Sequence, residues 1–166
     1  MNFDPIAICR ILNEERVDYV VVGGFASVIL GSPLPTEDID LLPDRSEENL
    51  IRLAAALERL NARIRTASEP VPAPLDAQFL ANMPVMLNLV TDFGIVDLTF
   101  EPSGPTRGFA GWNADASSEV IADGLVIRVA SLDDIIASKR AADREKDRRA
   151  LPYLESLRDI LRSGNS

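Results

Sequence analysis

Hydrophobic positions recur along the chain with two different spacings, one typical of helices and one typical of strands. Leucines three and four residues apart within 46–61 predict an amphipathic helix that Ser46 caps. Acidic and aliphatic residues alternate from Asp38 to Leu42, which predicts a strand with one polar face. The same reasoning predicts helices over 4–16, 25–30, 132–144 and 147–161, and strands over 18–22, 85–90, 95–100 and 125–129.

Segments without either spacing predict loops. The stretch 69–75 carries three prolines, and 101–116 is rich in Gly and Pro. We interpret the first as a linker, and Trp112 in the second as an anchor of its loop on the core. The order of elements predicts an α/β (α+β) fold, a mixed sheet of about four or five strands with helices mainly on one face. Residues 1–130 would form its core and 131–166 the closing helices, as a single domain.

Composition excludes several classes of protein. Of the 166 residues, 46% are hydrophobic and 26% charged, as in a globular domain. No apolar run reaches the roughly 18–20 residues that span a bilayer, and the first residues lack the basic region of a signal peptide. We therefore expect a cytoplasmic protein without a membrane partner. The absence of histidine and the single cysteine, Cys9, exclude Ser-His-Asp hydrolysis, histidine-ligated or cysteine-based zinc, and an intrachain disulfide.

The charge of the chain bears on which ligands and partners we expect. The net charge of −9 disfavours binding to duplex DNA, because phosphate contacts dominate that affinity. The 17 basic residues include only two lysines, Lys139 and Lys146, which lie seven residues apart. They would share a helix face if one helix continued through both. Chance in an arginine-rich chain explains the pair equally well.

Two aspartates on one strand are the first candidates for chemistry. Asp38 and Asp40 are two residues apart, so in a strand their carboxylates project from the same face. Close carboxylates repel, and a divalent cation between them relieves that repulsion. Oxygen ligands without histidine favour Mg²⁺ or Mn²⁺. A solvated polar strand face is the plainer interpretation of this pair alone.

Two further features strengthen the metal interpretation. Asp97 is a single acid within an otherwise apolar strand, where an unpaired buried carboxylate is costly. Gly23 and Gly24 follow a buried-type strand and precede a helix. Glycines there allow the backbone to approach a phosphate, which the amide groups at a helix N-terminus attract.

Taken together, these motifs resemble the DNA polymerase beta-like nucleotidyltransferase superfamily. The matching stretches are Val22–Ala26, Gly31–Leu42 and Ile95–Leu98, followed by a segment from Val129 to Asp147. Within the superfamily the chain is similar to small bacterial abortive-infection and toxin–antitoxin nucleotidyltransferases. The loop 32–36 departs from the pattern, because many relatives carry a basic residue there.

The resemblance implies a role for each matching residue. Asp38, Asp40 and Asp97 would be catalytic and hold the metal, and Asp97 would help to activate the attacking hydroxyl. A second group would bind the nucleoside triphosphate: Gly23, Gly24, Lys139, Arg144 and Lys146. The reaction would transfer a nucleoside monophosphate to a hydroxyl of a protein, an RNA end or a small molecule, in a toxin–antitoxin or phage-defence system with a cognate partner.

Two alternatives stay open at this point. A chain that retains the fold without activity would act as a partner-binding module, using 69–75 and the Trp112 loop as contact surfaces. An antibiotic-modifying nucleotidyltransferase would share the active site but need an acidic acceptor pocket.

Overall fold

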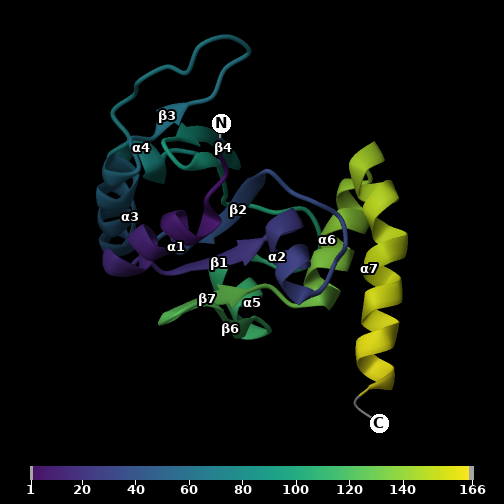
Figure 1. The fold of residues 1–166 in the computed structure, drawn as a ribbon. Coiled ribbons are helices and arrows are strands. Elements are labelled where there is room, and N and C mark those ends of the chain that lie inside the picture. The colour runs from purple at the N-terminus through teal and green to yellow at the C-terminus, as the bar shows by residue number, and fades with distance from the viewer. Residues whose placement is uncertain (1, 165–166) are drawn as a thin grey trace.

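A mixed β-sheet forms the centre of the computed structural model, which describes residues 2–164 (Figure 1). Its strands lie in the order β3-β4-β5-β2-β1-β7-β6. The pairs β2–β5 and β1–β7 are parallel, and the other neighbours are antiparallel. The strands are β1 (Tyr19–Val22), β2 (Asp38–Pro43), β3 (Arg63–Ile64), β4 (Met86–Thr91), β5 (Gly94–Thr99), β6 (Ser117–Ala122) and β7 (Leu125–Val129).

The mixed α/β architecture is confirmed, but the sheet is wider than predicted. It has seven strands in the described residues instead of four or five. The two additional strands are β3, which is only two residues long, and β6, which begins with the polar residues Ser117, Ser118 and Glu119. Both lie at the sheet edges, where short length and polar side chains are common.

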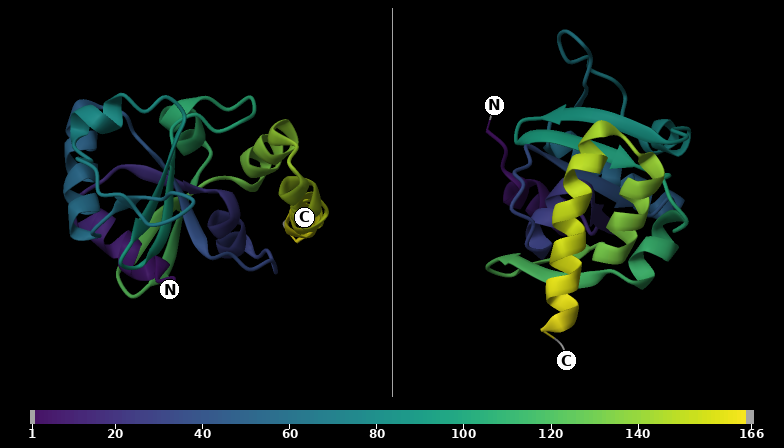
Figure 2. Two further views of the ribbon diagram at one scale, coloured as in Figure 1. Left: turned by 90° about the horizontal axis from the view of Figure 1, so that it is seen from above. Right: turned by 90° about the vertical axis from the view of Figure 1, so that its right-hand side faces the viewer.

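Helices lie on both sides of the sheet, whereas the sequence analysis expected them mainly on one. Helices α1, α3 and α4 cover one side, and α2, α5, α6 and α7 lie on the other (Figure 2). None of the helices within residues 2–164 is long and apolar enough to cross a membrane. Their bounds are α1 (Pro5–Glu14), α2 (Gly23–Leu30), α3 (Glu47–Arg59), α4 (Ala77–Ala81), α5 (Gly108–Ala114), α6 (Leu132–Ala142) and α7 (Glu145–Ser163).

The main hydrophobic core lies between the sheet and the pair α1 and α3. Ile39 and Leu41 of β2 point into it and are at most 1% exposed, so the intervening aspartates face the opposite side. The helices complete the core with their apolar stripes. Buried residues of those stripes are Ile8, Cys9 and Leu12 of α1 and Leu50, Leu53, Ala56 and Leu57 of α3.

A buried amide fixes the ends of the two central strands. Asn49, which is fully buried in α3, accepts a hydrogen bond from the Asp18 backbone at 2.7 Å. Its Nδ2 donates to the carbonyls of Asp18 at 2.9 Å and Asp44 at 2.7 Å. These contacts tie the start of β1 and the end of β2 to one helix, and they support the register in which Asp40 lies opposite Val22.

The Gly- and Pro-rich stretch 101–116 is not entirely loop. It contains α5, and Trp112 within that helix is 1% exposed. The prediction that Trp112 anchors its segment on the core is therefore confirmed, and this burial removes it as an exposed contact surface. A helix of only seven residues with two glycines has too weak a pattern to be found from sequence.

Candidate active site

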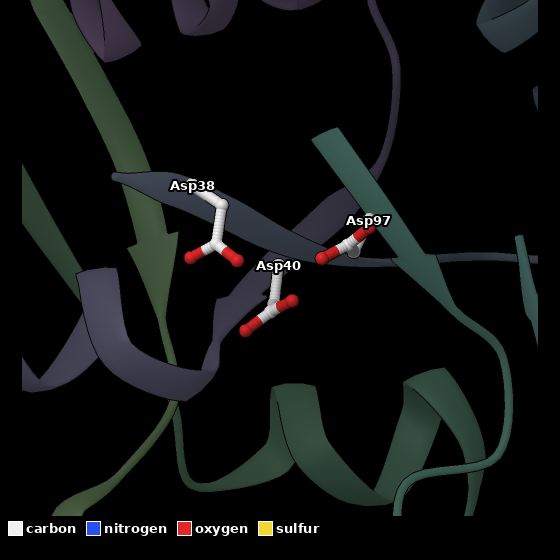
Figure 3. A group of neighbouring side chains, drawn as sticks. All are labelled: Asp38, Asp40 and Asp97. Carbon is white, nitrogen blue, oxygen red and sulfur yellow. The ribbon is translucent and has the colours of Figure 1, made fainter. Parts of the chain in front are cut away.

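Two parallel strands bring three carboxylates together. Asp40 of β2 lies directly beside Asp97 of β5 in the register, and Asp38 is two residues earlier on β2. Oxygen atoms of all three side chains lie within 4.8 Å of one another, and Figure 3 shows them directed toward a common space. The predicted convergence of these residues is thus a property of the fold.

The position of Asp40 requires a glycine at residue 23. Gly23 has a φ of +68°, a conformation that residues with a Cβ rarely adopt. A Cβ at this position would overlap Oδ2 of Asp40 and lie 2.9 Å from its Cγ. The glycine therefore leaves room for the aspartate as well as for a ligand. Gly24 packs less tightly, because a Cβ there would lie 3.3 Å from Oγ1 of Thr36.

A threonine in the loop before β2 orients the first aspartate. Oγ1 of Thr36 lies 3.0 Å from Oδ1 of Asp38 and 3.2 Å from its carbonyl oxygen, and it can donate to either. The loop 32–36, which lacks a basic residue, thus still supports the carboxylate cluster.

Crowding and burial raise the affinity of the cluster for protons. Burial and the charges of Asp38 and Asp97 raise the pKa of Asp40 to about 7, although Lys146 and Lys139 oppose the shift. Burial also raises the pKa of Asp97 to about 6, against the opposing charge of Arg65. A site of this kind binds positive charge readily, as a proton or as a metal ion.

The predicted cations line the same cavity as the aspartates. The cavity has a volume of about 590 Å³ and is bounded by the three aspartates, Gly23, Lys139, Arg144 and Lys146. The two lysines do not share a continuous helix face. Asp143, with a φ of 50°, ends α6, and α7 begins at Glu145, so the chain turns between them. The lysines reach the cavity from two helices instead of one.

No known protein family and no curated protein matches the chain by sequence. Several solved structures nevertheless resemble it over nearly its full length. The lincosamide antibiotic adenylyltransferase LnuA, in its lincomycin-bound form, is 18% identical, with 95% of this chain and 99% of that chain covered and a TM-score of 0.63. ANT(2″)-Ia in complex with adenylyl-2″-tobramycin is 17% identical, with 96% and 95% covered and a TM-score of 0.55.

A third structure, from Thermotoga maritima and ascribed a nucleotidyltransferase function, is 18% identical, with 96% and 91% covered and a TM-score of 0.52. The chain has a nucleotidyltransferase fold. The resemblance predicted from its motifs is therefore confirmed at the level of the fold.

On this nucleotidyltransferase fold, two residues of the site were missed by the sequence analysis. Nη2 of Arg65 lies 3.5 Å from Oδ1 of Asp97, and Arg65 lines the cavity. Asp147 is fully buried in the first turn of α7 and pairs with Lys139 and Arg144. No sequence signal marks Arg65, because it reaches the cavity through the pairing of β3 with β4, and β3 is too short to be predicted. Asp147 had one signal, its position three residues after Arg144 at a helix start.

The three aspartates fit a divalent cation. Their donor set consists only of oxygens, the preferred ligands of Mg²⁺ and Mn²⁺, and those oxygens come from two adjacent strands with a fixed register. Burial, followed by the neighbouring carboxylates, raises the pKa values of Asp40 and Asp97, and a bound cation would offset both effects. The nucleotidyltransferase fold thus provides a carboxylate site beside a basic wall.

Proposed function

We propose that the protein is a metal-dependent nucleotidyltransferase, which transfers a nucleoside monophosphate from a nucleoside triphosphate to a hydroxyl acceptor. The observation that carries the proposal is the juxtaposition in one cavity of Asp38, Asp40 and Asp97 with Lys139 and Lys146. Carboxylates alone suit a cation, and cations alone suit an anion. Their combination suits a triphosphate with its bound metal.

In this proposal Asp38, Asp40 and Asp97 hold Mg²⁺ or Mn²⁺. When bound, the metal supplies Lewis-acid activation of the α-phosphate and offsets the charge of the leaving pyrophosphate. Gly23 and Gly24 place the start of α2 against the phosphates, where backbone amides favour an anion.

Other steps of the proposed reaction, triphosphate binding and proton transfer, are carried out by side chains. Lys139, Arg144 and Lys146 bind the triphosphate and hold its α-phosphorus near the carboxylates. Asp97, at the edge of the cluster, accepts the proton of the acceptor hydroxyl. The acceptor oxygen forms the new bond to phosphorus, and the bond to pyrophosphate breaks.

The missing basic residue in the loop 32–36 motivated the alternative of an inactive partner-binding module. In the fold, Lys139 of α6, Lys146 of α7 and Arg144 between the two helices line the cavity, which provides positive charge without that loop. This arrangement favours the catalytic alternative. The toxin–antitoxin or phage-defence context, with a cognate partner, stays a prediction from the sequence motifs. Growth arrest upon expression that requires an intact Asp40 would support it.

Label transfer tests the proposal directly. The protein is incubated with each α-labelled nucleoside triphosphate and Mg²⁺ or Mn²⁺, together with RNA, protein or small hydroxylated acceptors. We expect metal-dependent nucleotide binding and transfer of label to one acceptor class, which Asp40→Asn abolishes. The matched control is Asp123→Asn, at an exposed turn between β6 and β7. If the parent neither binds nucleotide with metal nor transfers label to any acceptor, the partner-binding module is the better interpretation.

A further inference from the structure

Asp147 is an acidic residue that the proposed function does not yet use. It lies in the first turn of α7, and its side chain is 0% exposed. Its Oδ2 accepts hydrogen bonds from Nε of Arg144 at 2.7 Å and from the Arg144 backbone at 3.1 Å. Its Oδ1 lies 3.3 Å from Nη2 of Arg144 and 3.6 Å from Nζ of Lys139. One buried carboxylate thus holds two cations that line the cavity.

The carboxylate stays ionised in this position. Burial by itself would raise the pKa of Asp147, but the side-chain and backbone hydrogen bonds from Arg144, together with the charges of Arg144 and Lys139, hold it below its ordinary value. The cluster therefore contains one negative and two positive charges. Its net positive charge faces the cavity, because Lys139 and Arg144 line that cavity.

Lys139 and Arg144 share Asp147 as a common partner. They belong to different sides of the turn at Asp143, so no continuous helix sets their distance. Long basic side chains also lose rotamer freedom when they are fixed in one place. A partner that fixes them in the free protein removes that cost from ligand binding.

We propose that Asp147 is a positioning residue, which fixes Lys139 and Arg144 as a preformed pair for binding the phosphates of the nucleotide. The proposal rests on the proposed function, because it assigns the pair's ligand from it. Asp147 does not itself line the cavity, so it acts through the two cations. Its single carboxylate also joins the end of α6 to the start of α7, the two elements that carry the basic wall.

A double-mutant cycle tests this role. Binding of ATP, GTP, CTP and UTP with Mg²⁺ is measured by calorimetry, and the tightest ligand of the parent is carried forward. We expect Asp147→Asn to weaken its binding by about tenfold, because Lys139 and Arg144 must then become ordered when the nucleotide binds. In a Lys139→Ala, Arg144→Ala background the same change should weaken binding by less than about threefold, because the residues are coupled. Equal effects in both backgrounds would overturn the proposal.

Two comparisons separate positioning from folding. Glu145→Gln removes a charge from the same helical turn, where its side chain is 73% exposed, and it should leave nucleotide binding unchanged. Mg²⁺ binding by the aspartate cluster should be the same in Asp147→Asn as in the parent. Asp147→Ser provides a smaller hydroxyl acceptor for the Arg144 amide if the Asn variant does not fold. If both variants are unfolded, Asp147 is a folding determinant and the proposal fails.

The experiment also distinguishes this inference from the proposed function. If the parent protein binds no nucleoside triphosphate, the proposed function fails before the cycle begins. If the parent binds a nucleotide and Asp147→Asn binds it equally well, the proposed function survives and the role of Asp147 is refuted.

Discussion

Replacing Asp40 by Asn should change activity and metal-free stability in opposite directions. Burial and two neighbouring carboxylates raise the pKa of Asp40 from 3.8 to about 7. Because the folded pKa lies above the ordinary value, the protonated form favours folding. That contribution is complete below pH 3.8 and is lost as the pH rises through about 7. At pH 8 without metal, the ionised Asp40 is therefore a destabilising residue.

The size of the effect follows from the pKa. This rise in the pKa of Asp40, from 3.8 to about 7, corresponds to about 4 kcal/mol of unfolding free energy at pH 8. The side chain faces an open cavity and is only partly buried, so screening reduces this to on the order of 2 kcal/mol. For a domain of this length, that is a rise in Tm of about 4–8 °C.

Thermal unfolding of parent and Asp40→Asn, each at pH 5 and pH 8 with EDTA or with Mg²⁺, measures this effect. We expect the variant to be more stable than the parent at pH 8 in EDTA, and the gap to narrow at pH 5. With Mg²⁺ the gap should close or reverse, because the parent alone retains all ligands. Nucleotidyl transfer should fall by orders of magnitude. A variant that is clearly destabilised at pH 8, with Mg²⁺ binding intact, would show that Asp40 is structural.

Two further predictions concern its neighbours. Gly23→Ala should displace Asp40 and lower both Tm and Mg²⁺ affinity. The control is Gly124→Ala, at a φ of +67° and with no atom within 4 Å of the added Cβ, which should show only the strain of the backbone. Equal losses of Tm and Mg²⁺ affinity in the two variants would refute the close contact with Asp40. Arg65→Ala should strengthen Mg²⁺ binding at pH 8 by up to about fivefold and raise the pH at which that binding is lost, because Arg65 lowers the pKa of Asp97. The control is Arg63→Ala, which removes an ion pair with Asp92 outside the cavity. It should change neither the Mg²⁺ affinity nor the pH at which Mg²⁺ binding is lost, both measured by calorimetry. An equal response from both arginines would refute the role of Arg65.

Two members of the carboxylate cluster could be predicted from sequence because their geometry is local, whereas Asp97 joins them through the pairing of β2 with β5. Two-residue periodicity places Asp38 and Asp40 on one face. Asp97 was singled out as the one acid of an otherwise apolar strand, and the family resemblance implied its place in the site. The break between the last two helices was predicted within a few residues, but its conformation was not. The stretch around it has no Gly or Pro, and a single aspartate in the left-handed conformation ends the helix. The short pairing of β3 with β4, which delivers Arg65 to the site, depends on tertiary contacts that no local pattern encodes.

The charges of the cavity wall bear on the antibiotic-modifying alternative, which needs an acidic acceptor pocket. Beyond the three aspartates, Glu101 is the only acid among the described residues that line the cavity, and Arg65 is a cation on the same wall. The wall also carries exposed apolar side chains, Val85 at 51% and Met86 at 45%. With a metal bound as proposed, this surface would have no excess of negative charge for a polycationic acceptor. Its mixture of apolar and neutral polar groups suits an acceptor recognised by shape and hydrogen bonds.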